Sequence, residues 1–162
     1  MLAAFVVTAL AATACSTGGN SQRNSATATG EPPQKAASPS QKGAVVRINV
    51  TVDGTTLEAD IEDSRTARDF VAQLPLTLTL TDFHQTEKIS DLPAELSTVG
   101  APAGTAARAG DLAYYAPWGN LAVFYRDSGY ATGLIKLGHI DSGIDVVAEQ
   151  SNDFTVTIEA AG

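Results

Sequence analysis

Five ionisable residues lie within ten positions of one another near the middle of the chain. They are Asp82, His84, Glu87, Lys88 and Asp91. Carboxylates, an imidazole and an ammonium group can exchange protons with a bound molecule, and histidine titrates near neutral pH. One hypothesis is therefore an acid–base or ligand-polarising site around Glu87 and Lys88. The alternative is a turn in water, in which Glu87 and Lys88 form only a local ion pair.

A second candidate site is an aromatic-rich stretch between residues 114 and 125. Its aromatic residues are Tyr114, Tyr115, Trp118, Phe124 and Tyr125. Rings that carry polar groups are typical of ligand clefts, but they also fill the cores of small β proteins, so both interpretations stay open. The two stretches together give six candidate ligand-binding residues, namely His84, Glu87, Lys88, Tyr115, Trp118 and Tyr125.

Other patterns that carry chemistry are missing from the sequence. It has no Gly-x-Ser-x-Gly nucleophile motif and no glycine-rich phosphate loop. The histidines, His84 and His139, are far apart in the chain, and Cys15 is the single cysteine. We therefore expect no metal and no cofactor, and the catalytic residues of any reaction stay unknown.

The elements that must position these residues are mostly strands. Residues 45–62 alternate around an Asp-Gly pair and predict a hairpin, and Ser64 begins a short helix that Pro75 ends. Leucine occupies every second position of residues 74–80, and Thr77 and Thr79 stand between the last three leucines, which predicts a strand with one buried face.

The second half of the chain continues this pattern after a long loop, which we expect between residues 89 and 110 because of its prolines and glycines. The sequence then predicts a hairpin over 112–125, a strand over 134–140, a short helix over 144–150 and a closing strand over 153–160. About eight strands with two short helices predict a mostly β fold, a small closed or nearly closed antiparallel barrel.

The order of these elements resembles the bacterial cyclophilin-like domain family over nearly all of residues 45–160. The most specific matches are Leu74-Pro75-Leu76-Thr77, Glu87-Lys88, Leu92-Pro93, Gly110-Asp111-Leu112, Tyr114-Tyr115-Ala116-Pro117 and Leu121. The resemblance implies a cyclophilin-like closed barrel with two capping helices, and it does not by itself imply an activity.

Cyclophilins isomerise X-Pro bonds with an arginine that commonly follows a Phe-His pair. In this chain Phe83-His84 is followed by Gln85, which has no charged guanidinium group. The resemblance therefore implies the fold without the arginine of the isomerases.

The N-terminal segments predict that the protein is attached to a membrane. Residues 1–14 are small or apolar, which suits an export signal, and are too few for the roughly 20 residues of a membrane-spanning helix. Cys15 follows them directly and resembles the lipidated cysteine of the bacterial lipoprotein box. Residues 15–42 are polar and nearly free of aliphatic side chains, which predicts a disordered tether.

We therefore expect a lipoprotein signal peptide over 1–14, a lipid-anchored tether over 15–42 and a barrel domain over 43–162. The anchor places the domain on the extracytoplasmic side of the cell membrane. The chain has a net charge of −8, and residues 15–42 contribute +2, which leaves −10 on the barrel domain. Phosphates repel such a domain, so we expect no nucleic acid among its partners.

The function expected from the sequence is binding of an unknown small molecule or extended peptide, with the membrane as a second partner through the lipid on Cys15. One alternative is an enzyme, either a weak or divergent peptidyl-prolyl isomerase or another activity around Glu87 and Lys88. A third hypothesis is an accessory interaction subunit of an envelope complex.

Overall fold

The computed structural model describes residues 45–162, so the predictions for the signal peptide, Cys15 and the tether lie outside the described residues. The described part contains ten strands and two helices in the order β1 (Val46–Val52), β2 (Thr55–Ile61), α1 (Arg65–Val71), β3 (Leu76–Phe83), β4 (Glu87–Asp91), β5 (Gly104–Thr105), β6 (Asp111–Tyr115), β7 (Asn120–Phe124), β8 (Ala131–Thr132), β9 (Leu134–Ile140), α2 (Asp145–Ala148) and β10 (Phe154–Ala160).

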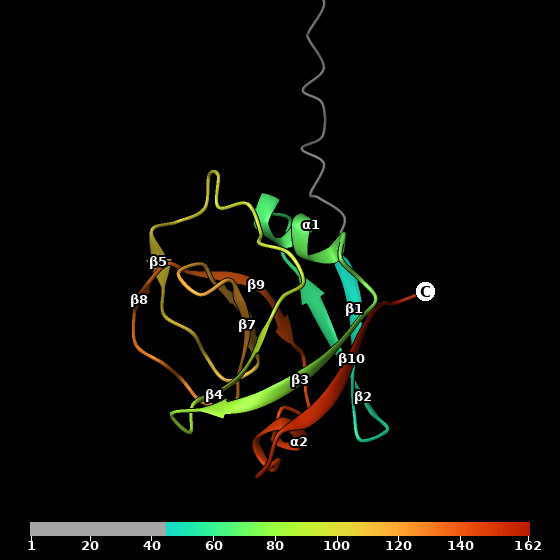
Figure 1. The fold of residues 1–162 in the computed structure, drawn as a ribbon. Helices are drawn as coiled ribbons and strands as arrows, with labels where there is room; N and C mark the ends of the chain where they lie inside the picture. The colour runs from blue at the N-terminus through green and yellow to red at the C-terminus, as the bar shows by residue number, and fades with distance from the viewer. Residues whose placement is uncertain (1–44) are drawn as a thin grey trace, which may run out of the picture. The chain divides into compact units, whose positions relative to one another are not determined.

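Eight of these strands form a closed barrel in the order β1-β10-β3-β4-β7-β6-β9-β2, and β2 pairs with β1 to complete the ring. All the pairings are antiparallel. The short strands β5 and β8 pair separately, to the left of the barrel in Figure 1. The predicted fold, a mostly β closed antiparallel barrel with two short helices, is confirmed.

The leucine–threonine alternation in β3 places the leucines in the core. Leu76, Leu78 and Leu80 are buried, and the threonines between them are exposed. Leu78 lies opposite Val156 and Leu80 opposite Phe154 on β10. These apolar cross-strand pairs fix the register, because a one-residue slip would turn every leucine to the outer face.

The two helices lie at opposite ends of the barrel (Figure 1). The hydroxyl group of Ser64 accepts a hydrogen bond of 3.1 Å from the backbone N–H of Ala67, the cap predicted for α1. Phe70 on α1 and Val147 on α2 have no exposed surface. Each helix therefore closes one end of the core. In the part of the chain that the structure covers, neither helix has the length and hydrophobicity of a membrane span.

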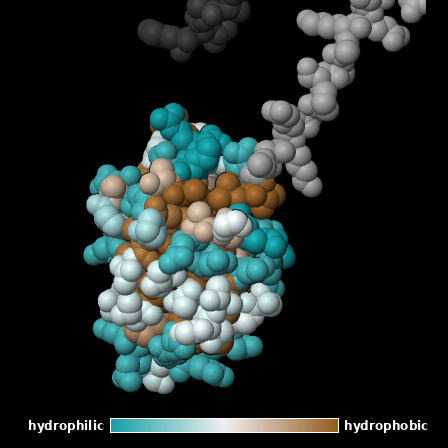
Figure 2. Space-filling model, turned by 90° about the vertical axis from the view of Figure 1, so that its right-hand side faces the viewer, coloured by the Kyte–Doolittle hydropathy of each residue, from teal (hydrophilic) through white to brown (hydrophobic). Residues whose placement is uncertain are grey.

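The outer face of β1, β2 and β10 is largely polar (Figure 2). Arg47 on β1 lies 3.1 Å from a carboxylate oxygen of Asp60 and 3.3 Å from one of Glu58, both on β2. A band of hydrophobic residues crosses this face toward the end where α1 lies (Figure 2).

The expected loop over residues 89–110 is partly wrong, because β4 extends from Glu87 to Asp91. In β4, Glu87 lies opposite Phe124 and Lys88 opposite Val123 of β7. The composition of β4 is unusual for a strand, and its pairing with β3 and β7 outweighs that local preference. Four of the five ionisable residues, Asp82, Glu87, Lys88 and Asp91, therefore form part of the barrel wall, and His84 lies in the turn between β3 and β4.

Candidate functional site

The wall formed by β4, β7, β6 and β9 carries buried side chains on both faces. Leu121 and Val123 of β7 point into the barrel core. Ala122 and Phe124 belong to a second buried cluster, with Ala113 of β6 among its members. Because side chains alternate along a strand, this second cluster lies on the outer face of the barrel.

A cavity of 330 Å³ lies on this outer wall, and we call it the outer-wall pocket. Its size falls within the range of small-molecule sites. The small side chain of Ala122 leaves space between neighbours on β7. The lining residues are mostly apolar: Phe83, Glu87, Ile89, Tyr115, Trp118, Asn120, Ala122, Phe124, Ser128, Ala131 and Leu134.

Three aromatic rings form one side of the outer-wall pocket. The ring of Trp118 meets Phe83 edge to face, with 5.3 Å between centroids and an angle of 89°. It meets Tyr115 in the same way, at 5.3 Å and 86°. Trp118 is 56% exposed. The pocket therefore presents a firmly packed aromatic surface that remains open to solvent.

Two lining residues carry polar groups of special interest. Glu87 is the acidic residue of the lining, and burial raises the pKa of its carboxyl group, although His84 partly opposes this effect. Asn120 is only 3% exposed, and its Oδ1 atom has no hydrogen-bond partner among the described residues. Among the described residues, Glu87 forms no ion pair and the Asn120 oxygen accepts no hydrogen bond, so both groups can still interact with a ligand.

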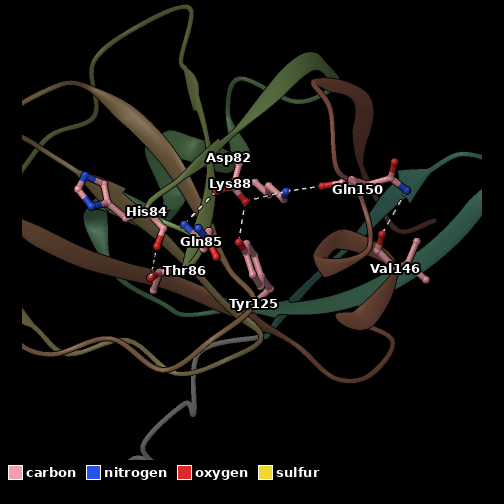
Figure 3. Close-up of polar contacts among 8 residues, drawn as sticks. All are labelled: Asp82, His84, Gln85, Thr86, Lys88, Tyr125, Val146 and Gln150. Carbon is pink, nitrogen blue, oxygen red and sulfur yellow. Dashed lines mark hydrogen bonds and ion pairs between the residues drawn. The ribbon is translucent and has the colours of Figure 1, made fainter.

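A separate polar cluster surrounds Lys88, which is only 2% exposed (Figure 3). Its Nζ atom lies 2.8 Å from Oδ2 of Asp82 and donates a hydrogen bond of 2.6 Å to the carbonyl oxygen of Gln150. The hydroxyl group of Tyr125 donates to the same Asp82 oxygen at 2.6 Å. We call Asp82, Lys88, Tyr125 and Gln150 the Lys88 cluster.

Charge and hydrogen bonding shift two pKa values in the Lys88 cluster. The hydrogen bonds from Lys88 and Tyr125 lower the pKa of Asp82 to about 2. Burial and the Asp82 carboxylate raise the pKa of Tyr125 to about 12. The cluster connects β4 with the segment that follows α2. The ammonium group of Lys88 is therefore already paired and is not available to a ligand.

The structure divides the six candidate residues into separate groups. Glu87, Tyr115 and Trp118 line the outer-wall pocket, whereas Lys88 and Tyr125 belong to the Lys88 cluster. The alternative interpretation, a local ion pair between Glu87 and Lys88, is wrong, because Lys88 pairs with Asp82 across the β3–β4 hairpin. The two residues are adjacent in a strand, so their side chains point to opposite faces.

His84 lies in the tight turn between β3 and β4. Both His84 and Gln85 have left-handed backbones, with φ of 54° and 55°. Asp82 accepts a 2.9 Å hydrogen bond from the backbone N–H of Gln85, which stabilises this turn. The imidazole of His84 is exposed, and its ring centroid lies 4.2 Å from that of Phe83. It points away from the Lys88 cluster (Figure 3).

Phe83 and Asn120 are among the lining residues of the outer-wall pocket that sequence reasoning did not select. Phe83 was considered only as part of the Phe-His pair, and Asn120, which lies within the hairpin expected over 112–125, is the first residue of β7. The sequence of β7 gave no signal for Asn120, because all five residues of this strand are buried and no polar–apolar alternation marks its two faces. In the aromatic stretch, Tyr114 packs in the barrel core and Phe124 in the outer cluster, so these two rings support the packing interpretation.

A further polar group that the sequence did not indicate is the buried carboxylate of Asp111 on β6. Its Oδ1 atom lies 2.7 Å from Nζ of Lys136 and 2.9 Å from Nδ1 of His139, both on β9. Burial raises the pKa of Asp111, but hydrogen bonds from Lys136, the Arg108 backbone and His139 outweigh this effect and lower it overall. These contacts brace β6 against β9. Within residues 45–162, no group of three or more potential ligands is arranged to hold a metal ion.

Comparisons with known proteins agree with the barrel architecture. The solution structure of a hypothetical protein from Archaeoglobus fulgidus has a TM-score of 0.58 and 16% sequence identity, over 75% of this chain and 99% of that protein. At this identity the likeness concerns the fold alone. Curated proteins give no match. The model of the cyclophilin-like family matches residues 50–159, most of the chain, and the protein therefore belongs to the cyclophilin-like family.

Proposed function

We propose that the barrel domain binds a small molecule or an extended peptide in the outer-wall pocket and does not catalyse a reaction. The observation that carries this proposal is the 330 Å³ cavity lined by Phe83, Tyr115 and Trp118. Apolar and aromatic linings with a few polar groups are typical of sites that bind organic ligands. The aromatic rings supply apolar contact area, and the polar groups of Glu87 and Asn120 can orient the bound ligand.

A binding role has more support than an isomerase role. Cyclophilins use an arginine at the proline peptide bond, and no arginine or lysine is among the residues that line the outer-wall pocket. Gln85, which follows the Phe-His pair, lies in the β3–β4 turn. Lys88, the cation that the sequence offered for catalysis, is engaged by Asp82. We therefore expect no acceleration of X-Pro isomerisation.

The proposal includes a location on the extracytoplasmic side of the cell membrane, through a lipid on Cys15. Its support is the short apolar segment that ends at Cys15 and the polar composition of residues 15–42. Cys15→Ala is expected to release the chain from the membrane fraction. Retention of this variant in the membrane fraction would contradict the anchor.

The binding proposal is tested by NMR titration of the full chain with 2-phenylethanol and with a proline-containing tetrapeptide. We expect saturable shifts of the indole N–H signal of Trp118, the chain's single tryptophan, in roughly the millimolar range for so small an alcohol. Ala122→Leu, which fills the pocket, should abolish the shifts. Tyr130→Ala removes an exposed aromatic residue outside the lining and should leave them unchanged.

The same preparation is assayed for isomerisation of the tetrapeptide. An unchanged rate agrees with a binding protein, and an acceleration that Ala122→Leu removes would support the isomerase alternative. If neither probe shifts the Trp118 signal, the outer-wall pocket is not the binding site.

A further inference from the structure

The outer-wall pocket contains a half-buried carboxylate, Glu87, that forms no ion pair among the described residues, and a buried amide, Asn120, whose oxygen has no hydrogen-bond partner among them. We propose that its occupant is a small organic amine, with an ammonium group at one end, a hydrogen-bond donor at the other and an apolar, preferably aromatic, body between them. The ammonium group pairs with Glu87 and the donor with Asn120. Because it concerns the same pocket, this inference rests on the proposed function.

Glu87 is the reason to expect a positive charge on the ligand. The neighbours of Glu87 on the adjoining strands are Phe83 and Phe124, which are aromatic and apolar. The adjacent cation, Lys88, points to the other face and pairs with Asp82. Among the ion pairs of the described residues, none involves Glu87. A half-buried carboxylate in apolar surroundings loses hydration that a bound cation restores.

The aromatic rings of the outer-wall pocket also favour a positively charged ligand. A cation near the face of a tryptophan, tyrosine or phenylalanine ring is attracted by the negative potential of the ring face. Phe83, Tyr115 and Trp118 all line the cavity. The barrel domain also has an excess of acidic residues, so an anionic ligand meets repulsion at long range and at the pocket itself.

Asn120 is the reason to expect a hydrogen-bond donor at the second end of the ligand. A buried amide oxygen without a partner costs about 1–3 kcal/mol. Asn120 is 3% exposed, its Oδ1 atom has no partner among residues 45–162, and it lines the cavity. A hydrogen-bond donor on the occupant, such as a phenol or hydroxyl group, satisfies this oxygen.

The strand register sets the spacing of the two ends. Glu87 lies opposite Phe124, and Asn120 is four residues earlier on β7, or roughly 13 Å along the strand. Ile89 and Ala122, which face each other between these positions, form the apolar middle of the pocket. The two polar groups lie toward opposite ends of the pocket, so an elongated occupant with a polar group at each end fits better than a compact ammonium ion.

Four probes that share one aromatic ring test this inference on the full chain, with the Trp118 indole signal as the readout. Tyramine has both the ammonium group and the phenol. Phenethylamine lacks the phenol, 2-(4-hydroxyphenyl)ethanol lacks the ammonium group, and 3-(4-hydroxyphenyl)propionate has a negative charge instead. We expect tyramine to bind most tightly, loss of the ammonium group to weaken binding about tenfold, and the anion to bind weakest.

Two variants assign these preferences to residues. Glu87→Gln should remove the preference for tyramine over 2-(4-hydroxyphenyl)ethanol and leave the affinity for the alcohol within about twofold. Asn120→Val should remove the preference for tyramine over phenethylamine, with Asn120→Ser as a second variant at this buried position. Glu159→Gln, at an exposed carboxylate on β10, is the matched control and should change neither preference.

The outcomes separate the two levels of the proposal. If the neutral alcohol or the anion binds as tightly as tyramine, the pocket binds ligands but the amine inference is wrong. The inference is also wrong if Glu87→Gln preserves the preference for the amine. If none of the four probes shifts the Trp118 signal but 2-phenylethanol or the tetrapeptide does, the inference fails and the proposed binding function stands. If no probe shifts the signal, both fail.

Discussion

Glu87 and Lys88 are neighbours in β4, but they belong to different environments on the two sides of the barrel wall. Glu87 lines the outer-wall pocket, whereas the Lys88 ammonium group lies 2.8 Å from Asp82 and is shielded from solvent. One strand therefore supplies a negative charge to a candidate binding site and a positive charge to a structural cluster. The two residues should respond differently to substitution.

Lys88→Ala is expected to lower the free energy of unfolding by about 3 kcal/mol. It removes a buried side chain, leaves the Gln150 carbonyl without its donor and deprives Asp82 of its cation. Urea denaturation measures the change. Arg65→Ala, at an exposed cation on α1, should stay within about 0.5 kcal/mol of the parent chain. Equal losses in the two variants would show that the Lys88 cluster does not stabilise the fold.

The stabilisation from Asp82 should disappear in acid. Its pKa is about 2 in the folded chain, because Lys88 and Tyr125 bond to the carboxylate, and its ordinary value is 3.8. A lowered folded pKa stabilises the fold above the ordinary value, and this contribution is lost as the pH falls through about 2. Asp82→Asn should therefore be less stable than the parent at pH 7, and the difference should shrink between pH 4 and pH 2. A difference that is constant over this range would contradict the assignment.

Gly138→Ala is expected to destabilise the barrel by about 2 kcal/mol or more. A Cβ atom at Gly138 would overlap the carbonyl oxygen of Asp60 and lie 2.8 Å from Cδ1 of Ile61, across the β2–β9 pairing. Gly129 provides the matched control, since a Cβ atom there has no neighbour within 4 Å. Thermal unfolding followed by circular dichroism should separate the two variants, and similar melting temperatures would contradict the close approach of β2 and β9.

Asn120→Val should leave the free energy of unfolding unchanged or raise it by up to about 1 kcal/mol. The parent residue is 3% exposed and has an unpaired amide oxygen, so its removal eliminates a desolvation cost. Urea denaturation without ligand is the measurement. A loss of more than about 1 kcal/mol would mean that Asn120 stabilises the fold, contrary to its assignment as a ligand-binding group.

Much of the fold could be predicted because period-two alternation and turn residues are local signals. The leucines of β3 and the Asp53-Gly54 turn of the first hairpin carry enough information in a few positions. Strand β4 could not be predicted in this way. Its residues Glu87, Lys88, Ser90 and Asp91 resemble a loop, and their strand conformation depends on β7, a segment about 30 residues later.

The candidate site was predictable only in part, for a related reason. The sequence identified Glu87, Tyr115 and Trp118 as residue types that suit binding, and all three line one cavity. Whether Lys88 joins them depends on the face of β4 that each side chain occupies, and this depends on the register with β3 and β7. Asn120 became visible only once its burial and its unpaired oxygen were known.

The antiparallel pairing of β1 with β10 brings the two ends of the described domain together. The backbone N–H of Ala161 donates a 2.9 Å hydrogen bond to the carbonyl oxygen of Arg47, so the start of β1 lies beside the end of β10. A short peptide linker between these ends closes the barrel chain into a covalent circle. The domain is therefore suited to circular permutation, with new termini in the segment between β4 and β5, while every strand keeps its present neighbours.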